Sequence, residues 1–216
     1  MNYSQFFEKW EPLIPKKELE KALNNINSLS FKYNILPNKK YIFKAFFDCP
    51  IDKLNIVFLG QDPYSQKDIA TGLCFANNSE SLYTSPSLKV LLDSIDKYYD
   101  DVPIGGKKDL HYLAKQGVLL LNSALTVIEN NPASNLEIWD SFTKQLIINI
   151  KSEYPHTIFV LFGEWCKRYS TIIDKEFTIL SPHPSYCARN NILLPNIFKQ
   201  IDGINIKYNK PLIYWK

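Results

Sequence analysis

Three side chains that can take part in hydrolysis each follow a short apolar run of the sequence: Asp62, Asn122 and His183. A fixed carboxylate can stabilise a growing positive charge, and an imidazole N–H can stabilise negative charge on a leaving group. A side-chain amide offers both a donor and an acceptor, so it can pair with the polar edge of a ring. Together these groups suit a hydrolysis in which the leaving group departs as an anion and water attacks a cationic centre.

Other kinds of catalytic site lack their sequence signals. No G-x-G-x-x-G, P-loop or G-x-S-x-G motif occurs, so the usual nucleotide-binding loops and the serine-hydrolase elbow are not expected. The three histidines lie far apart, and the four cysteines form no C-x-x-C pair. We therefore expect no metal site and no cofactor, and we expect the thiols to be reduced.

The composition is that of a globular protein with one core. The 216 residues are 45% hydrophobic, so we expect a single domain that spans residues 1–216. The formal net charge of +3 neither requires nor excludes a polyanionic partner, because local clusters of charge matter more than the sum. The N-terminal segment, residues 1–15, has no apolar signal core, and no apolar run has membrane-spanning length. These observations favour a soluble, cytoplasmic protein that does not contact a membrane.

Four apolar runs predict the strands that must position the reactive side chains. A run such as Ile56 to Leu59, apolar at every position, favours a buried parallel strand over an amphipathic one. Gly60 allows a close turn after this strand, and Pro63 fixes the direction of the chain beyond it. The other predicted strands are residues 117–121, 157–162 and 177–180.

Helical patterns separate these strands. Ser85 and Pro86 have the residue types of an N-cap and a first helical position, so a helix should begin there. Residues 65–84 are rich in Ser, Asn and Thr and predict a long connection. The remaining helices are expected at residues 16–28 (on the surface), 39–48, 135–152 and 190–202, the last one interrupted by Pro195.

The alternation predicts an α/β fold with a central four-stranded, mostly parallel sheet flanked by helices. Ligands of such sheets bind at the carboxyl ends of the strands. One edge of the sheet should therefore collect the residues that follow the four strands, namely Asp62, Tyr64, Asn122, Gly163 and His183.

Five short motifs occur along the chain in this order: Gly60-Gln-Asp-Pro-Tyr64, Gly72-Leu-Cys-Phe75, Ser85-Pro-Ser-Leu-Lys89, Gly117-Val-Leu-Leu-Leu-Asn122 with Leu125-Thr-Val127, and His183-Pro-Ser185. In order and spacing they resemble the uracil-DNA glycosylases of the most widespread type. The resemblance runs from about residue 40 to the closing segment Pro211-Leu-Ile-Tyr-Trp215, whereas residues 1–38 carry no motif. It implies the fold of that family and a monofunctional hydrolysis of the N-glycosidic bond of flipped-out uracil in DNA, which leaves an abasic site for base excision repair.

The resemblance also implies roles for individual residues. Asp62 would position the attacking water and offset the positive charge on the sugar, and His183 would donate a hydrogen bond to uracil O2 as the base leaves. Asn122 matches the N3–H donor and O4 acceptor of uracil, whereas cytosine reverses both. Tyr64 would pack against C5 and exclude the methyl group of thymine, and Phe75 would stack on the base. Gln61 would act chiefly through its backbone N–H.

Each of these residue types also has an ordinary structural role. An aspartate or asparagine can cap a turn, a histidine between prolines can be a loop residue, and a phenylalanine is usually part of a core.

DNA that contains uracil, single- or double-stranded, is the implied partner. Ser87 and Ser185 match serines that contact phosphate, and Lys89, Lys167, Arg168 and Arg189 would add positive charge. We expect a monomer, and the resemblance allows a protein inhibitor as a further partner.

Three departures from the family lie on the side that grips DNA. Tyr186-Cys187-Ala188 stands where the family has Pro-Leu-Ser, so the leucine that wedges into the base stack is missing and Tyr186 could replace it by stacking. Glu164 follows Gly163 where the family has a small hydroxyl residue, and a carboxylate there would repel phosphate. Ser65 replaces a histidine. We therefore expect uracil specificity to be kept, with weaker duplex binding and a preference for single strands.

Two other functions fit parts of the pattern. The altered DNA-gripping residues would suit a DNA-binding or replication-accessory protein that has lost catalysis, although the presence of Asp62 and His183 argues against it. A glycosylase for another 5-substituted uracil is the second, and Tyr64 argues against bulky substituents.

Overall fold

Four strands form a parallel sheet in the order β3-β2-β5-β6. They are β2 (Ile56–Gly60), β3 (Val118–Asn122), β5 (Ile158–Phe162) and β6 (Thr178–Ser181). All three pairings are parallel. Every residue of β2, β3 and β5 is buried, which explains why these strands are apolar at consecutive positions. The predicted α/β fold with a four-stranded parallel sheet is confirmed.

This computed structural model describes residues 7–80, 83–99 and 108–216. Residues 1–6 of the N-terminal segment and residues 81–82 of the predicted connection lie outside the described residues. Within the described parts, none of the helices combines the length and the apolar character that crossing a bilayer requires.

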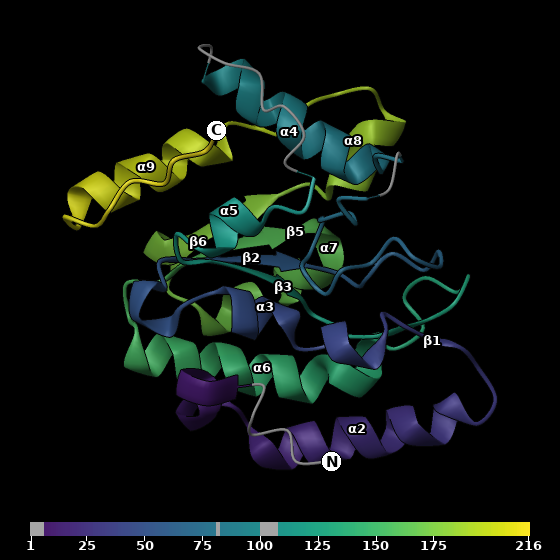
Figure 1. Cartoon of the computed structure of the whole chain (residues 1–216). Helices are drawn as coiled ribbons and strands as arrows, with labels where there is room; N and C mark the ends of the chain where they lie inside the picture. The colour runs from purple at the N-terminus through teal and green to yellow at the C-terminus, as the bar shows by residue number, and fades with distance from the viewer. Residues whose placement is uncertain (1–6, 81–82, 100–107) are drawn as a thin grey trace.

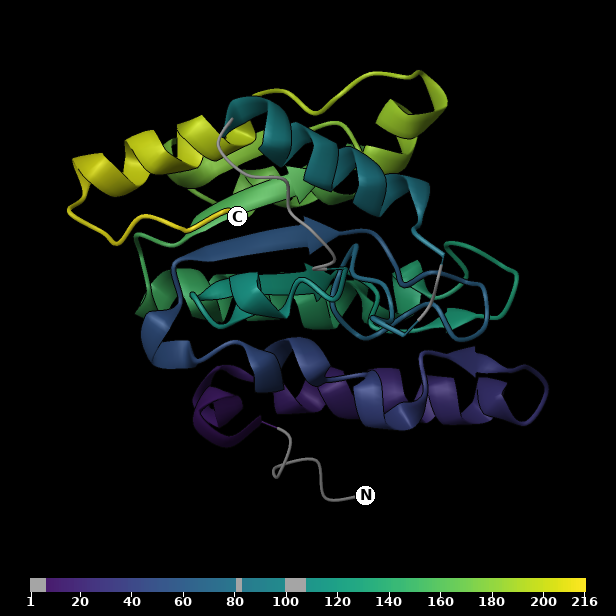
Figure 2. The same ribbon diagram turned by 45° about the horizontal axis from the view of Figure 1, so that its top comes forward.

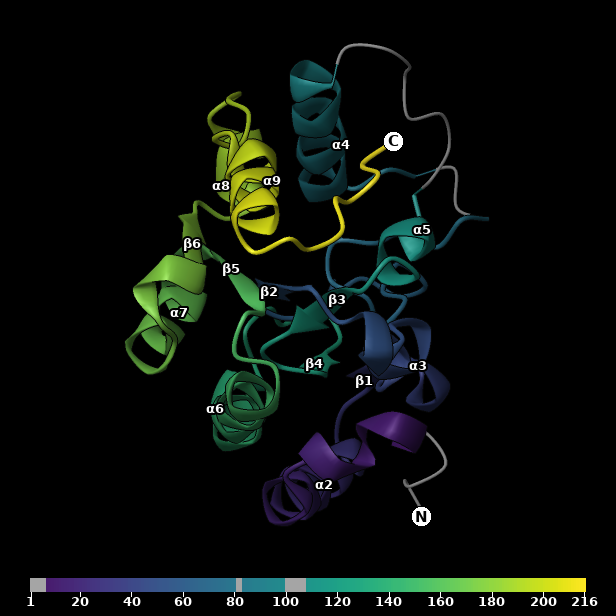
Figure 3. The same cartoon turned by 90° about the vertical axis from the view of Figure 1, so that its left-hand side faces the viewer.

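Helices cover both faces of the sheet. Figures 1 and 3 show α4, α8 and α9 on one face and α3 and α6 on the other, with α2 packed outside α6. The C-terminus lies on the side of the sheet that carries α9, the yellow helix in Figure 2. The helices are α2 (Lys16–Ser30), α3 (Lys44–Asp48), α4 (Pro86–Tyr98), α5 (His111–Ala114), α6 (Leu136–Glu153), α7 (Gly163–Lys167), α8 (Pro184–Arg189) and α9 (Ile197–Lys207).

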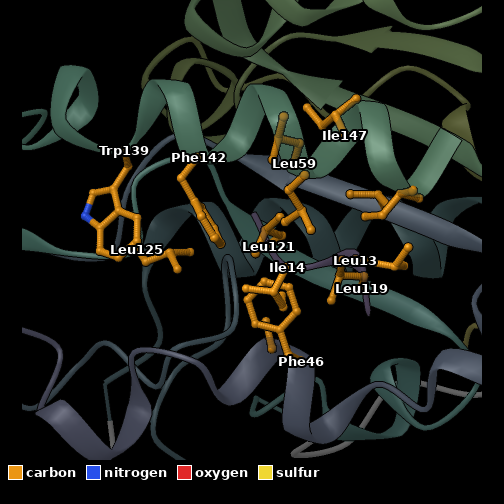
Figure 4. Packing of buried hydrophobic residues seen from close by; sticks show 14 of the residues in the cluster. Leu13, Ile14, Phe46, Leu59, Leu119, Leu121, Leu125, Trp139, Phe142 and Ile147 are labelled. Atoms are coloured by element: carbon orange, nitrogen blue, oxygen red, sulfur yellow. The ribbon is translucent and has the colours of Figure 1, made fainter. Parts of the chain in front are cut away.

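Alternate residues of the strands enter two separate cores. Leu59, Leu119 and Leu121 point to the α6 side, where they meet Phe142 of α6 and Phe46 of α3 (Figure 4). The strand residues between them enter the second core with α4 and α9. The sheet is therefore held from both sides, and its strand ends are fixed in position.

The N-terminal segment, which carries no family motif, adds to the first core. Phe7 and Trp10 place their rings 5.5 and 5.4 Å from the ring of Phe46, and the Trp10 indole N–H donates to the Cys49 carbonyl at 2.8 Å. The expected surface helix at 16–28 forms as α2, and it buries Leu19, Ala22, Leu23 and Ile26.

Two helix predictions are wrong in their boundaries. The single helix expected at 39–48 is a 3₁₀ turn, η2 (Lys39–Tyr41), followed by α3. The two residues between these elements, Ile42 and Phe43, are buried. The helix expected at 190–202 begins only at Ile197, as α9. Pro195 lies before this helix because a proline is poorly tolerated in a helix interior. A short helix that was not predicted, α8, follows the last strand.

A small antiparallel pair was not predicted. β1 (Ile35–Leu36) pairs with β4 (Val127–Ile128), and each strand has only two residues. Such short strands have too few positions to show an alternating pattern in the sequence.

Two glycine-to-alanine substitutions should have opposite effects on stability. A Cβ on Gly117, which has a φ of +92°, would lie 1.9 Å from the Lys53 carbonyl oxygen, whereas a Cβ on Gly203 of α9 meets nothing within 4 Å. We expect Gly117→Ala to lower the free energy of unfolding by at least about 2 kcal/mol. Gly203→Ala should raise it by about 0.5–1 kcal/mol. Urea denaturation of both variants measures the two changes, and shifts of the same sign would contradict this description of the backbone.

Candidate active site at the carboxyl edge of the sheet

A cavity of about 570 Å³ lies at the carboxyl ends of the parallel strands. It brings together residues from segments far apart in the sequence, including most of those predicted for the site. The predicted residues that line it are Gln61, Asp62, Tyr64, Phe75, Ser87, Asn122, His183, Ser185 and Arg189. Lys89 and Tyr186 are not lining residues.

The position of Asn122 depends on the register of two strands. Gly60 at the end of β2 is paired with Asn122 at the end of β3. A Cβ on Gly60 would lie 2.7 Å from Asn122 Oδ1, so only glycine leaves room for this amide. Asn122 is 5% exposed, and its side chain makes no hydrogen bond to another described residue. Its donor and acceptor are therefore available to a ligand in the cavity.

Asp62 is held by two donors. The backbone N–H of Ala133 donates to Oδ2 at 2.6 Å, and the Gln61 amide donates to Oδ1 at 3.2 Å. Burial raises the pKa of Asp62, and these two hydrogen bonds act in the opposite direction. The carboxylate is thus fixed in orientation while it is partly removed from solvent.

The Ala133 contact was missed by the sequence analysis. Ala133 has a φ of +66° in a turn whose Asn130 N–H donates to the Ser65 carbonyl at 2.8 Å. Antiparallel β1–β4 pairing holds the chain just before this turn. The run Asn130-Asn-Pro132 is a turn signal, but nothing in the sequence indicates that the turn reaches Asp62.

The groups around His183 determine its tautomer. It is the N-cap of α8, and Nδ1 accepts a hydrogen bond from the Ser185 backbone N–H at 3.1 Å, with Ser185 Oγ at 2.7 Å. Since Nδ1 is an acceptor, the proton of the neutral ring is on Nε2. Burial and the nearby Arg189 charge lower the pKa of His183 to about 4. At neutral pH the ring is an uncharged donor.

Aromatic rings form the walls of the cavity. Phe75 is 5% exposed, and its ring lies edge-on to Phe162 at 4.9 Å and to His183 at 5.6 Å. The Tyr64 hydroxyl donates to the Phe75 carbonyl at 2.9 Å. Burial raises the pKa of Tyr64, so the phenol keeps its proton. A flat, largely apolar ring fits between such walls.

The outer part of the site carries the predicted DNA contacts. Ser87 is buried in the first turn of α4. Lys89 forms an ion pair with Asp93 at 2.7 Å, and Tyr186 is half-exposed on α8. Glu164 lines the cavity, and its carboxylate is 3.4 Å from the Lys167 ammonium, which offsets part of its negative charge.

Trp165 and Pro132 also line the cavity, and neither was predicted as a site residue. The Arg168 guanidinium lies 4.3 Å from the Trp165 ring centroid. Nothing in the local sequence distinguishes this tryptophan, three residues after the end of β5, from a core residue.

A larger hollow, of about 1110 Å³, shares Gln66, Ala70 and Leu73 with this cavity. Its charged lining residues have both signs, and it contains none of the predicted site residues. Among the residues that the structure describes, no group of three or more His, Cys, Asp or Glu side chains is arranged to hold a metal ion.

Comparisons with known proteins identify the family of this chain. The model of the family described as the uracil DNA glycosylase superfamily matches residues 46–201. The uracil-DNA glycosylase of Borrelia turicatae is 35% identical over 94% of this chain and 93% of its own length. That of Psychromonas ingrahamii is 31% identical over 100% of both.

Solved structures show the same fold. The crystal structure of mimivirus uracil-DNA glycosylase superimposes with a TM-score of 0.78 at 21% identity, covering 99% of this chain and 91% of that chain. A tyrosine-to-phenylalanine variant of the mimivirus protein in complex with UGI gives a TM-score of 0.83 at 23% identity, covering 99% and 87%.

The fold and the relatives together define a DNA glycosylase, a hydrolase that acts on a base in DNA. The chain belongs to the uracil DNA glycosylase superfamily. The predicted family, enzyme class and uracil-excising function are confirmed, and they set aside the non-catalytic alternative.

The protonation state of His183 gives a test of the site's geometry. We expect nuclear magnetic resonance of the imidazole nitrogens to show a neutral ring with its proton on Nε2 from pH 8 down to about pH 5. A ring that titrates near its ordinary pKa of 6.5, or that carries its proton on Nδ1, would contradict the geometry.

The same titration affects stability. Because the pKa is lower in the folded chain, protonation favours the unfolded chain. The contribution of His183 to stability is therefore complete above pH 6.5 and is lost as the pH falls toward 4.

Proposed function

We propose that the cavity binds a uracil base turned out of the DNA stack, and that Asp62 and His183 promote cleavage of its N-glycosidic bond. The observation that carries this proposal is that one cavity contains a carboxylate, a neutral imidazole donor and an available side-chain amide between aromatic walls. The imidazole is an uncharged donor, and two hydrogen bonds act to keep the carboxyl group ionised against the effect of burial.

The bond between sugar C1′ and uracil N1 breaks first in this scheme, and its electron pair leaves with the base. Negative charge then gathers on uracil O2, where the Nε2–H of His183 donates. A neutral donor suits this step because it stabilises the anion without having to give up its proton. The sugar that remains is cationic, and the Asp62 carboxylate stabilises it at close range.

Water completes the reaction. Asp62 accepts a hydrogen bond from the water that attacks C1′, and the proton released by the water ends on the departed base. The products are an abasic site and uracil. The Ala133 and Gln61 donors keep the carboxylate directed toward one place, so it does not have to reorient during the reaction.

Recognition of uracil is assigned to Asn122, Tyr64, Phe75 and Gln61. Asn122 pairs with N3–H and O4 of uracil, and a cytosine would leave a buried donor facing a donor. Phe75 stacks on the base, and Tyr64 stands beside C5. The backbone N–H of Gln61 completes the binding of the base.

The DNA on either side of the base is assigned to Ser87, Ser185 and Arg189, which line the cavity, and to Lys89 and Tyr186 on the surface beyond it. Tyr186 is half-exposed and can stack on a neighbouring base. Glu164 weakens the attraction for phosphate at the cavity. These features support a preference for single-stranded DNA.

We also propose that the chain acts as a monomer and that an inhibitor protein can bind the face that carries the cavity. The second proposal is supported by the mimivirus variant that was crystallised in complex with UGI.

Replacing Asp62 tests the catalytic proposal. We expect Asp62→Asn to lower the single-turnover rate on a uracil oligonucleotide by about 100-fold or more, since it removes the charge that stabilises the cationic sugar. The folded structure should persist because the amide oxygen can still accept from Ala133.

The matched control is Asp68→Asn, which alters an exposed aspartate that does not line the cavity. It should leave the rate unchanged. Near-normal excision by Asp62→Asn, or an equal loss in the control, would remove Asp62 from its role.

The strand preference is tested with matched oligonucleotides. We expect the unaltered chain to excise uracil faster from the single strand than from the duplex. We also expect Tyr186→Ala to weaken binding of single strands by about tenfold, because stacking on the base is lost. Tyr214→Ala, which alters an exposed tyrosine outside the cavity, is the control. A strong preference of the unaltered chain for duplex DNA would refute this part of the proposal.

A further inference from the structure

The Tyr64 ring is anchored at both ends. Its Cα belongs to the loop after β2, and its hydroxyl donates to the Phe75 carbonyl at 2.9 Å and accepts from Ser85 Oγ at 2.5 Å. The ring that lines the cavity therefore joins the loop after β2, the segment at Phe75 and the start of α4. A ring held in this way cannot turn aside without breaking a buried hydrogen bond.

Ser85 is itself held in place by buried groups. It is 1% exposed and is the N-cap of α4, where its Oγ accepts from the Leu88 N–H at 3.3 Å. Its Oγ also lies 2.8 Å from Asn77 Oδ1, and its backbone N–H donates to the same oxygen at 3.4 Å. Since Ser85 has one hydroxyl proton, it can donate to Tyr64 or to Asn77, but not to both at once.

Asn77 fixes this arrangement to a further segment. It is fully buried, its N–H donates to the Lys108 carbonyl at 2.9 Å, and it forms a β-bridge with Ala70. The hydroxyl of Ser85 is thus held between the helix start and a buried loop. An N-cap needs none of these additional contacts, because a side-chain oxygen that accepts from the first turn is sufficient.

We propose that Ser85, held by Asn77, is a positioning residue for substrate specificity. It fixes the Tyr64 ring against the 5-position of the bound pyrimidine, so that exclusion of a 5-methyl group depends on a hydroxyl that does not touch the substrate. This inference rests on the role proposed above for Tyr64. Burial also raises the pKa of Tyr64, which keeps its hydroxyl as a donor across the working pH range.

The position of the ring decides between uracil and thymine because the two bases differ only at that point. A methyl group at C5 needs space that the fixed ring occupies. If the ring can shift, the methyl group enters at a smaller cost while uracil binds as before. Loss of the Ser85 hydroxyl should therefore change discrimination more than it changes the reaction of uracil itself.

The experiment compares Ser85→Ala with the unaltered chain on single-stranded oligonucleotides that carry uracil, 5-fluorouracil or thymine at one position. For each protein, the single-turnover rate on each base is divided by the rate on uracil. This relative rate is then compared between the variant and the unaltered chain, so that intrinsic differences between the leaving groups cancel. We expect the relative rate for thymine to rise by about threefold to tenfold, which corresponds to one net hydrogen bond. The smaller 5-fluorouracil should change less.

Two further variants separate positioning from helix capping. Asn196→Ala removes the N-cap of α9, where Asn196 Oδ1 accepts from the Lys199 N–H at 3.1 Å, and Asn196 does not line the cavity. It should leave the relative rates unchanged. In a chain that already carries Tyr64→Phe, adding Ser85→Ala should have no further effect on discrimination, because the hydroxyl that Ser85 holds is gone.

Binding of free uracil and free thymine to the same proteins measures discrimination without catalysis. It separates a failure of this inference from a failure of the proposed reaction, because it does not require bond cleavage. We expect Ser85→Ala to bind thymine more strongly relative to uracil. An unchanged ratio, an equal change in Asn196→Ala, or a full effect of Ser85→Ala in the Tyr64→Phe chain would overturn the inference.

Discussion

The site depends on the parallel register that places Gly60 opposite Asn122. Parallel strands carry their carboxyl ends to one edge, so four separate segments of the chain deliver their side chains to a single cavity. The missing Cβ at Gly60 gives the amide its room, since an added Cβ would lie 2.7 Å from Asn122 Oδ1. A shift of one residue in this pairing would turn the amide to the other face of the sheet. The two hydrophobic cores that hold the sheet from both sides therefore also hold the geometry of the site.

Burial shifts the pKa values of the two groups proposed to react, Asp62 and His183, in opposite directions. It raises the pKa of Asp62 and lowers the pKa of His183, so both shifts favour the neutral form. The proposed reaction uses the neutral form of His183, and the Ser185 N–H selects the tautomer with Nε2–H. For Asp62 the proposed reaction needs the charged form, and the hydrogen bonds from Ala133 and Gln61 lower the pKa that burial raises. Burial and the Arg189 charge thus keep His183 neutral, whereas the hydrogen bonds to Asp62 act to lower its pKa against the effect of burial.

Local sequence signals predicted the parts of this structure that depend on neighbouring residues. The apolar runs form the strands, and Ser85 with Pro86 starts α4 as expected. The errors lie where distant contacts decide, as in the break of the helix at 39–48 and in the β1–β4 pair that supports the turn at Ala133. Lys89 and Asp93 are four residues apart on one helix, a spacing at which opposite charges pair. Their ion pair partly neutralises the charge of Lys89. The hydroxyl contacts of Tyr64 join residues up to 21 positions apart, which no local pattern indicates.

We propose above all that this cavity excises uracil from DNA with its own side chains. The most direct measurement treats an end-labelled oligonucleotide that contains one uracil with the protein in the presence of a metal chelator, followed by alkali. We expect free uracil and strand cleavage at that position alone, with no cleavage of the same oligonucleotide carrying thymine. An oligonucleotide that stays intact, or that is cut without release of uracil, would contradict it.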